Sequence, residues 1–66
     1  MNWQTKELQQ FIGKQYAAVK EDILKKFILH DQIIVLLDVG DTVPQRTGQI
    51  VVHLTNTNMI VDIRMD

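Results

Sequence analysis

The sequence predicts an α+β fold, in which an N-terminal amphipathic helix packs on a three-stranded antiparallel meander sheet. Apolar residues recur at helical spacing over residues 3–29, and in three later segments they occupy at least every second position. The predicted strands cover residues 33–39, 48–54 and 59–65. A chain of this length forms one core, so we predict a single α+β domain over residues 1–66.

The helical segment carries one apolar stripe, which passes through a glycine. The stripe follows the three- and four-residue spacing of a helix and consists of Leu8, Phe11, Ile12, Tyr16, Val19, Ile23 and Phe27, with Leu24 and Ile28 beside it. Gly13 could end a first helix, or the helix could continue across it at a cost of about 1 kcal/mol relative to alanine. The helix is therefore expected to be continuous, kinked or split at Gly13, and the unbroken stripe favours a single helix.

The alternation of the strands predicts which sheet face is buried. Residues 55–58 are polar and suit a tight turn between the second and third strands. A hairpin centred there gathers six apolar residues on one face, pairing Leu54 with Met59, Val52 with Val61 and Ile50 with Ile63. An antiparallel first strand extends this face through Ile33, Val35 and Leu37. This face is predicted to pack on the helix.

In the same register, the second sheet face carries four aliphatic residues, Ile34, Leu36, Val51 and Ile60. Charged and polar residues surround them: Asp38, Gln49, His53, Asp62 and Arg64. An apolar centre with a polar rim is typical of an association surface, and exposed patches of this kind are uncommon on monomers. We therefore predict that the four aliphatic residues form a protein interface. The alternative is that the loop of residues 40–47, or the helix, covers this face.

Trp3 also belongs to the predicted interface, because the predicted helix is longer than the predicted strands. An unbroken helix over residues 3–29 would be about 39 Å long, whereas a seven-residue strand spans about 23 Å. Its first turns would extend beyond the sheet and would need a partner, most simply a second copy of the chain.

The residue inventory gives little support to an enzyme. The chain contains neither serine nor cysteine, so the commonest side-chain nucleophiles are missing. Its glycines do not have the spacing of a phosphate-binding loop. Two groups of residues could form a metal site: His30 and His53 with Asp31, and Asp38 and Asp62 with Arg64. Patterns this generic are more often surface groups, so no catalytic residue, metal or cofactor is predicted.

The net charge and the hydropathy of the chain limit the kinds of partner that it is expected to bind. The formal net charge is −1, unlike the strongly basic character of most proteins that bind the nucleic-acid backbone. The first residues lack the apolar core of a signal peptide and the longest apolar run, residues 33–37, is too short for a membrane span. A cytoplasmic location and no membrane partner are therefore expected.

These observations favour a small, non-enzymatic interaction or regulatory module. A chain this short buries little apolar surface by itself, so we expect it to form a homodimer, to bind a larger protein, or both. The alternative is a nucleic-acid-binding accessory protein whose contacts come from the helix and the long loop, through Lys20, Lys25, Lys26 and Arg46.

Overall fold

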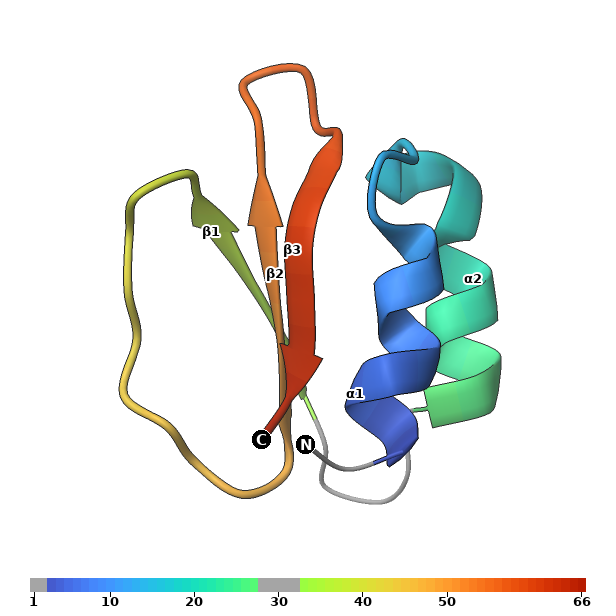
Figure 1. Cartoon of the computed structure of the whole chain (residues 1–66), viewed down its shortest axis with the longest axis vertical. Coiled ribbons are helices and arrows are strands. Elements are labelled where there is room, and N and C mark those ends of the chain that lie inside the picture. The colour runs from blue at the N-terminus through green and yellow to red at the C-terminus, as the bar shows by residue number, and fades with distance from the viewer. Residues whose placement is uncertain (1–2, 28–32) are drawn as a thin grey trace.

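Helices cover one face of a three-stranded sheet, and a long loop crosses the other face (Figure 1). This computed structural model describes residues 3–27 and 33–66, with the side chains of residues 5–26 and 33–66. The helical elements are α1 (Trp3–Leu8), the 3-10 turn η1 (Gln9–Phe11) and α2 (Tyr16–Phe27). The strands are β1 (Ile33–Asp38), β2 (Gln49–Leu54) and β3 (Ile60–Met65). The predicted α+β class is confirmed.

The helical region is split at Gly13, which was one of the alternatives that the sequence left open. Ile12 leaves the helix with an extended backbone, φ −61° and ψ 133°, and Gly13 follows at φ +89°. Glycine adopts positive φ without the steric penalty of a side chain. The chain therefore reverses direction here, and α2 runs back beside α1 (Figure 1). Residues 28 and 29 of the predicted helix lie outside the described residues.

The strand order β1-β2-β3 agrees with the predicted meander, but one pairing differs. β2 and β3 are antiparallel, as predicted. β1 and β2 are parallel, with Ile34 beside Ile50 and Leu36 beside Val52, so the prediction of an antiparallel sheet is wrong for this pair. The segment after β1 must return to the other end of the sheet before β2 begins, and Figure 1 shows it passing along the face opposite the helices.

Parallel pairing reverses the predicted faces of β1. Ile34 and Leu36 lie on the side of the helices, because their neighbours Ile50 and Val52 belong to the core. The residues between them face the loop. The predicted core positions Ile33, Val35 and Leu37 are therefore on the loop side, and the predicted register of this strand is wrong.

β3 contains an irregularity that also shifts its pattern. Val52 pairs with Ile63, but Leu54 pairs with Ile60, so β3 has one extra residue in this interval. As a result Ile60, Ile63 and Met65 face the helices and Val61 is 38% exposed. All three predicted pairs of this hairpin are therefore wrong. Thr55 lies opposite Met59, so Leu54 meets Ile60 instead. The extra residue then shifts the remaining two pairs, so that Val52 and Ile50 meet Ile63 and Met65 in place of Val61 and Ile63.

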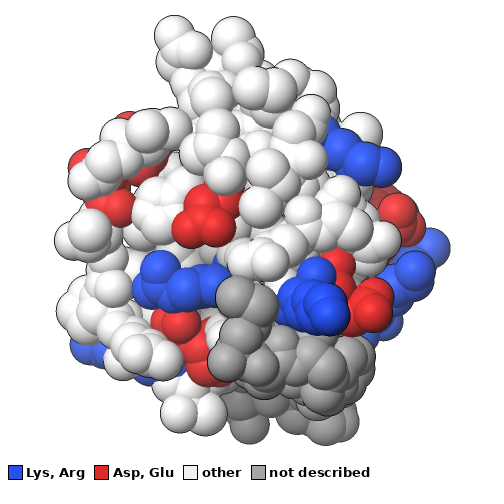
Figure 2. All heavy atoms as spheres, in the orientation of Figure 1, with Lys and Arg blue, Asp and Glu red and all other residues white. Residues whose placement is uncertain are grey.

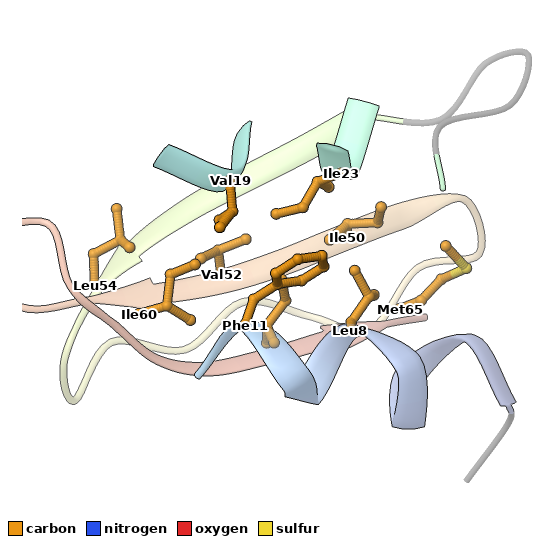
Figure 3. Packing of buried hydrophobic residues seen from close by; sticks show 10 residues of the cluster. Leu8, Phe11, Val19, Ile23, Ile50, Val52, Leu54, Ile60 and Met65 are labelled. Carbon is orange, nitrogen blue, oxygen red and sulfur yellow. The ribbon is translucent and has the colours of Figure 1, made fainter. Parts of the chain in front are cut away.

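The core lies between the helices and the sheet (Figure 3). Leu8 and Phe11 approach it from the first helical segment, and Val19 and Ile23 approach it from α2. The sheet contributes residues from its two antiparallel strands: Ile50, Val52, Leu54, Ile60, Ile63 and Met65. β1 adds only the partly buried Ile34. The core is therefore centred on β2 and β3, and β1 lies at its margin.

Candidate interaction surface

The segment between η1 and α2 binds the start of β3 along its outer edge. The N–H of Gly13 donates to the carbonyl of Ile60 at 2.8 Å, and the N–H of Ile60 donates to the carbonyl of Lys14 at 2.9 Å. Gln15 forms an antiparallel bridge with Met59, and the N–H of Tyr16 donates to the carbonyl of Asn58. The split at Gly13 thus supplies a short extended segment, which provides hydrogen-bond partners for the backbone groups at the start of β3.

Thr5 closes the far end of the same edge. Its buried hydroxyl accepts a hydrogen bond from the N–H of Met65 at 3.1 Å and donates one to the carbonyl of Met65 at 3.2 Å. The hydroxyl therefore supplies Met65 with the acceptor and the donor that one residue of a neighbouring strand would provide. These contacts also hold α1 beside β3.

The outer edge of β1 has no such cover among the residues that the structure describes. There β1 pairs with β2 alone. The N–H of Ile33 donates to the carbonyl of Gly48 and so points towards β2. Backbone groups of successive strand residues point to opposite edges, so the N–H and C=O groups of Ile34 and Leu36 point away from the sheet.

The side chains of β1 are apolar on both faces. Ile33 is 59% exposed, Leu36 is 49% exposed and Val39, the next residue after the strand, is 61% exposed. Asp38, at the C-terminal end, is the strand's charged residue. Strands that are apolar on both faces are normally found inside sheets, and exposed edge strands usually carry lysine, proline or a bulge that prevents pairing. We call the outer backbone edge of β1, with Ile33, Ile34, Val35, Leu36 and Leu37, the β1 edge.

The predicted interface residues are not all on one surface. Ile34, Leu36 and Ile60 lie on the side of the helices, whereas Val51 lies on the opposite side. Ile60 and Val51 have no accessible surface. Their placement together on one exposed face is therefore wrong, although Ile34 and Leu36 do lie together on β1. The side chain of Trp3 lies outside the described set.

The loop of residues 39–48 covers the face that was predicted to be free. One ring nitrogen of His53, Nε2, lies 2.8 Å from the carbonyl oxygen of Asp41. The Nε2 of Gln49 donates to the carbonyl of Pro44 at 2.9 Å. These bonds attach both halves of the loop to β2, and Val51 is buried between them. The alternative of loop cover, left open by the sequence, is the arrangement observed.

Asp66 strengthens this attachment. Its carboxylate accepts hydrogen bonds from Gln49 Nε2 at 2.7 Å and from Arg64 Nε at 2.8 Å. Burial would raise the pKa of Asp66, but these two hydrogen bonds, the charge of Arg64 and a backbone hydrogen bond from Arg46 together hold the pKa below its usual value. A carboxylate that also binds the loop backbone links β2, β3 and the loop.

The structure separates the two carboxylates of one candidate metal site, and the other candidate site lies partly outside the described residues. Asp38 is paired with the core residue Leu54 and lies on the side of the helices, whereas Asp62 is paired with His53 on the side of the loop. His30 and Asp31 lie outside the described residues. Within the described part of the chain, no group of three or more His, Cys, Asp or Glu side chains is close enough to hold a metal ion.

The basic residues weighed for nucleic-acid contact are exposed but not gathered. On α2, Lys25 and Lys26 are about 140° and 240° around the helix axis from Lys20. Arg46 belongs to the loop on the opposite side of the sheet. Figure 2 shows basic and acidic side chains interspersed on the visible face. These four residues therefore do not form one basic surface.

Comparisons with known proteins provide no family for this chain. No protein-family model matches it, and no curated protein is significantly similar to it. Among the described residues, no helix is long and apolar enough to cross a membrane.

The sequence itself contains a signal for the β1 edge. Residues 33–37 are apolar without interruption, which indicates a strand that is to be covered on both faces. Among the described residues, β1 has one neighbouring strand, and its side chains are only partly covered. The β1 edge is therefore the candidate interaction surface, because its sequence is typical of a covered strand whereas its side chains are partly exposed.

Proposed function

We propose that this chain is a small, non-enzymatic protein-interaction module that binds a partner by strand addition to the β1 edge. In strand addition, an extended segment joins a sheet through backbone hydrogen bonds, and alternate side chains provide further contacts. The observation that carries the proposal is that Ile34 and Leu36 direct their backbone groups outward from a strand that is apolar on both faces.

The remainder of the fold supports this assignment. At the opposite edge, the segment between η1 and α2 and the hydroxyl of Thr5 bind the backbone at the two ends of β3. The loop covers the back of the sheet, and the helices cover its front. The β1 edge is thus the part of the described sheet at which a partner strand gains both hydrogen bonds and apolar contact. It replaces the second sheet face as the proposed interface.

A defined strand probe tests the proposal. We would titrate isotope-labelled protein, diluted below any self-association, with a capped synthetic peptide of alternating threonine and valine with a lysine at each end. Strand addition predicts that the largest changes in amide chemical shift occur at Ile34 and Leu36. It also predicts that the amide hydrogen exchange of both residues becomes slower, because their N–H groups acquire acceptors.

Two lysine variants provide the matched comparison. Leu36→Lys places a charge on the β1 edge, and Val61→Lys places one at a similarly exposed position on β3. We expect the first to weaken peptide binding about tenfold or more and the second to leave it unchanged. Peptide-induced changes that map to the helices, or an equal loss in both variants, would show that the β1 edge is not the binding element.

Nucleic-acid binding, the alternative from the sequence, gains no support from the geometry. Lys20, Lys25 and Lys26 point in different directions around α2. Arg46 lies in the loop on the other side of the sheet. A phosphate backbone requires a continuous basic surface, which these residues do not form.

A further inference from the structure

We infer that the strand that occupies the β1 edge is β1 of a second copy of this chain, paired antiparallel about a two-fold axis at Val35. This inference rests on the proposed function, because it names the partner of the same edge. It gives a homodimer with one continuous six-stranded sheet.

The backbone groups favour this register. An antiparallel strand exchanges two hydrogen bonds at each pair of residues that both point their backbone groups across the junction. With the axis at Val35, Ile34 pairs with Leu36 of the second copy, and Leu36 pairs with its Ile34. All four outward groups of these two residues then acquire partners. The axis at Leu36 would instead place Ile34 opposite Asp38, whose carbonyl already accepts from Asp41.

The side chains are self-complementary in the same register. Val35 meets Val35 of the second copy, and Ile33 meets Leu37, so each apolar side chain on the loop side has an apolar neighbour. The two copies of Asp38 lie at opposite ends of the junction. A parallel, in-register pairing would place them side by side, and like charges that are directly opposite destabilise a sheet. Charge therefore favours antiparallel self-pairing.

The layers of the fold are compatible with this symmetry. Two antiparallel strands of one sheet are related by an axis perpendicular to the sheet, so both copies keep their helices on one face and their loops on the other. The helices lie on one face of the sheet and the loop lies on the other (Figure 1), and β1 is an end strand of the described sheet. An isologous contact of this kind closes at two copies.

Disulfide cross-linking tests the register directly, since the chain has no cysteine of its own. In the proposed dimer, the two copies of residue 35 form a non-hydrogen-bonded pair with Cα atoms about 4.5 Å apart, a separation that a disulfide spans. The two copies of residue 36 are diagonal neighbours, about 7–8 Å apart. Val35→Cys is therefore expected to form a covalent dimer about tenfold faster than Leu36→Cys under mild oxidation.

Light scattering on the wild-type chain provides the second readout and requires no substitution. We expect a mass of twice 7.7 kDa at high concentration, and the monomer mass for Leu36→Lys at the same concentration. A monomeric wild type would overturn the inference. Equal cross-linking rates, or a faster rate for Leu36→Cys, would overturn the axis at Val35.

The peptide titration separates this inference from the proposed function. If the wild type is monomeric and the threonine–valine peptide still protects Ile34 and Leu36, the β1 edge binds strands but not its own copy. If the peptide fails to bind the diluted monomer, strand addition itself is contradicted.

Discussion

The two edges of this sheet differ in how their backbone groups are satisfied. At β3, Gly13, Lys14 and the hydroxyl of Thr5 supply partners for the outward backbone groups at the two ends of the strand. At β1, Ile34 and Leu36 direct theirs outward with no neighbouring strand among the described residues. Proteins commonly protect both edges of a sheet against pairing, so the contrast indicates that the open edge has a use.

The contrast also explains how the stability of a small domain is distributed. The core is built on β2 and β3, where the helices pack, whereas β1 contributes only the partly buried Ile34. A chain of this size buries about 60% of the surface that its unfolded state exposes. Pairing at β1 would bury further apolar surface at the strand that contributes least to the core. The predictions below test this difference between β1 and the rest of the sheet.

Removal of the Thr5 hydroxyl is expected to have the largest effect on the monomer. Thr5→Val keeps the shape of the side chain but withdraws the partner that Thr5 supplies to the N–H and C=O of Met65. We expect a loss of about 2 to 3 kcal/mol in the free energy of unfolding, since each buried polar group that loses a partner costs about 1–3 kcal/mol. Urea unfolding measures it.

Thr42→Val is the matched control for Thr5. Thr42 lies exposed in the loop, so the same substitution there should change the free energy of unfolding by less than about 0.5 kcal/mol. Equal losses in the two variants would show that the Thr5 hydroxyl does not close the β3 edge.

The attachment of the loop should weaken in acid. The pKa of Asp66 is lower in the folded chain than its ordinary value of 3.8, so its stabilisation is complete above that value and is lost as the pH falls through the folded pKa. Asp66→Asn is expected to lose about 1 to 2 kcal/mol near neutral pH, because its hydrogen bonds involve a charged carboxylate.

A pH series of urea unfolding checks this assignment. The difference in the free energy of unfolding between wild type and Asp66→Asn should shrink as the pH falls below 3.8. A difference that stays constant down to about pH 2 would mean that the charge of Asp66 does not contribute to the attachment.

Gly13 should tolerate some substitutions better than others. Apart from Gly13 and its two chain neighbours, no residue has a heavy atom within 4 Å of the position that a Cβ would occupy, but the φ of Gly13 is +89°. Gly13→Ala is therefore expected to cost about 1 kcal/mol through backbone strain alone, whereas Gly13→Asn should cost less, because asparagine adopts positive φ more readily. Thermal unfolding of both variants measures the difference, and an equal loss would contradict a backbone origin.

The smallest effect on monomer stability is expected at the open edge. Leu36→Lys and Val61→Lys should each change the free energy of unfolding of the dilute chain by about 0.5 kcal/mol or less, because both side chains are substantially exposed. Only Leu36→Lys should abolish the dependence of the melting temperature on protein concentration. A loss of several kcal/mol in the dilute chain would show that Leu36 belongs to the core.

The sequence predicted the elements well and their pairing only in part. Helical spacing identified the helical region, and β-type alternation placed each strand within one residue of its observed bounds. The chain also turns within the polar residues 55–58 as predicted, with Asn58 at φ +65°, although Thr55 and not Leu54 is bonded to Met59. These features depend on local sequence, which explains why they could be predicted.

The parallel pairing of β1 could not be predicted from local pattern. An antiparallel hairpin was the simplest interpretation, because parallel strands are usually joined by a helix in a longer connection. Ten residues, 39–48, reach about 33 Å when extended, enough to return along a six-residue strand of about 20 Å. The burial of Val51 beneath this loop is a tertiary gain that alternation in sequence does not reveal.

The positions of the four predicted interface residues could be predicted only in part for the same reason. Ile34 and Leu36 do lie on one face of β1. Val51 and Ile60 were grouped with them by a register that the extra residue in β3 and the parallel pairing of β1 both alter. Exposure is a property of the assembled edge, so the openness of β1 became visible only with the structure.

Amide hydrogen exchange at single-residue resolution tests the contrast between the edges most directly. In dilute protein, the amides of Ile60 and Met65 should exchange slowly, because Lys14 and Thr5 accept from them, whereas those of Ile34 and Leu36 should exchange rapidly. At high concentration, all four should exchange slowly. Slow exchange of Ile34 and Leu36 at every concentration would mean that the monomer closes its own β1 edge, and would contradict the account.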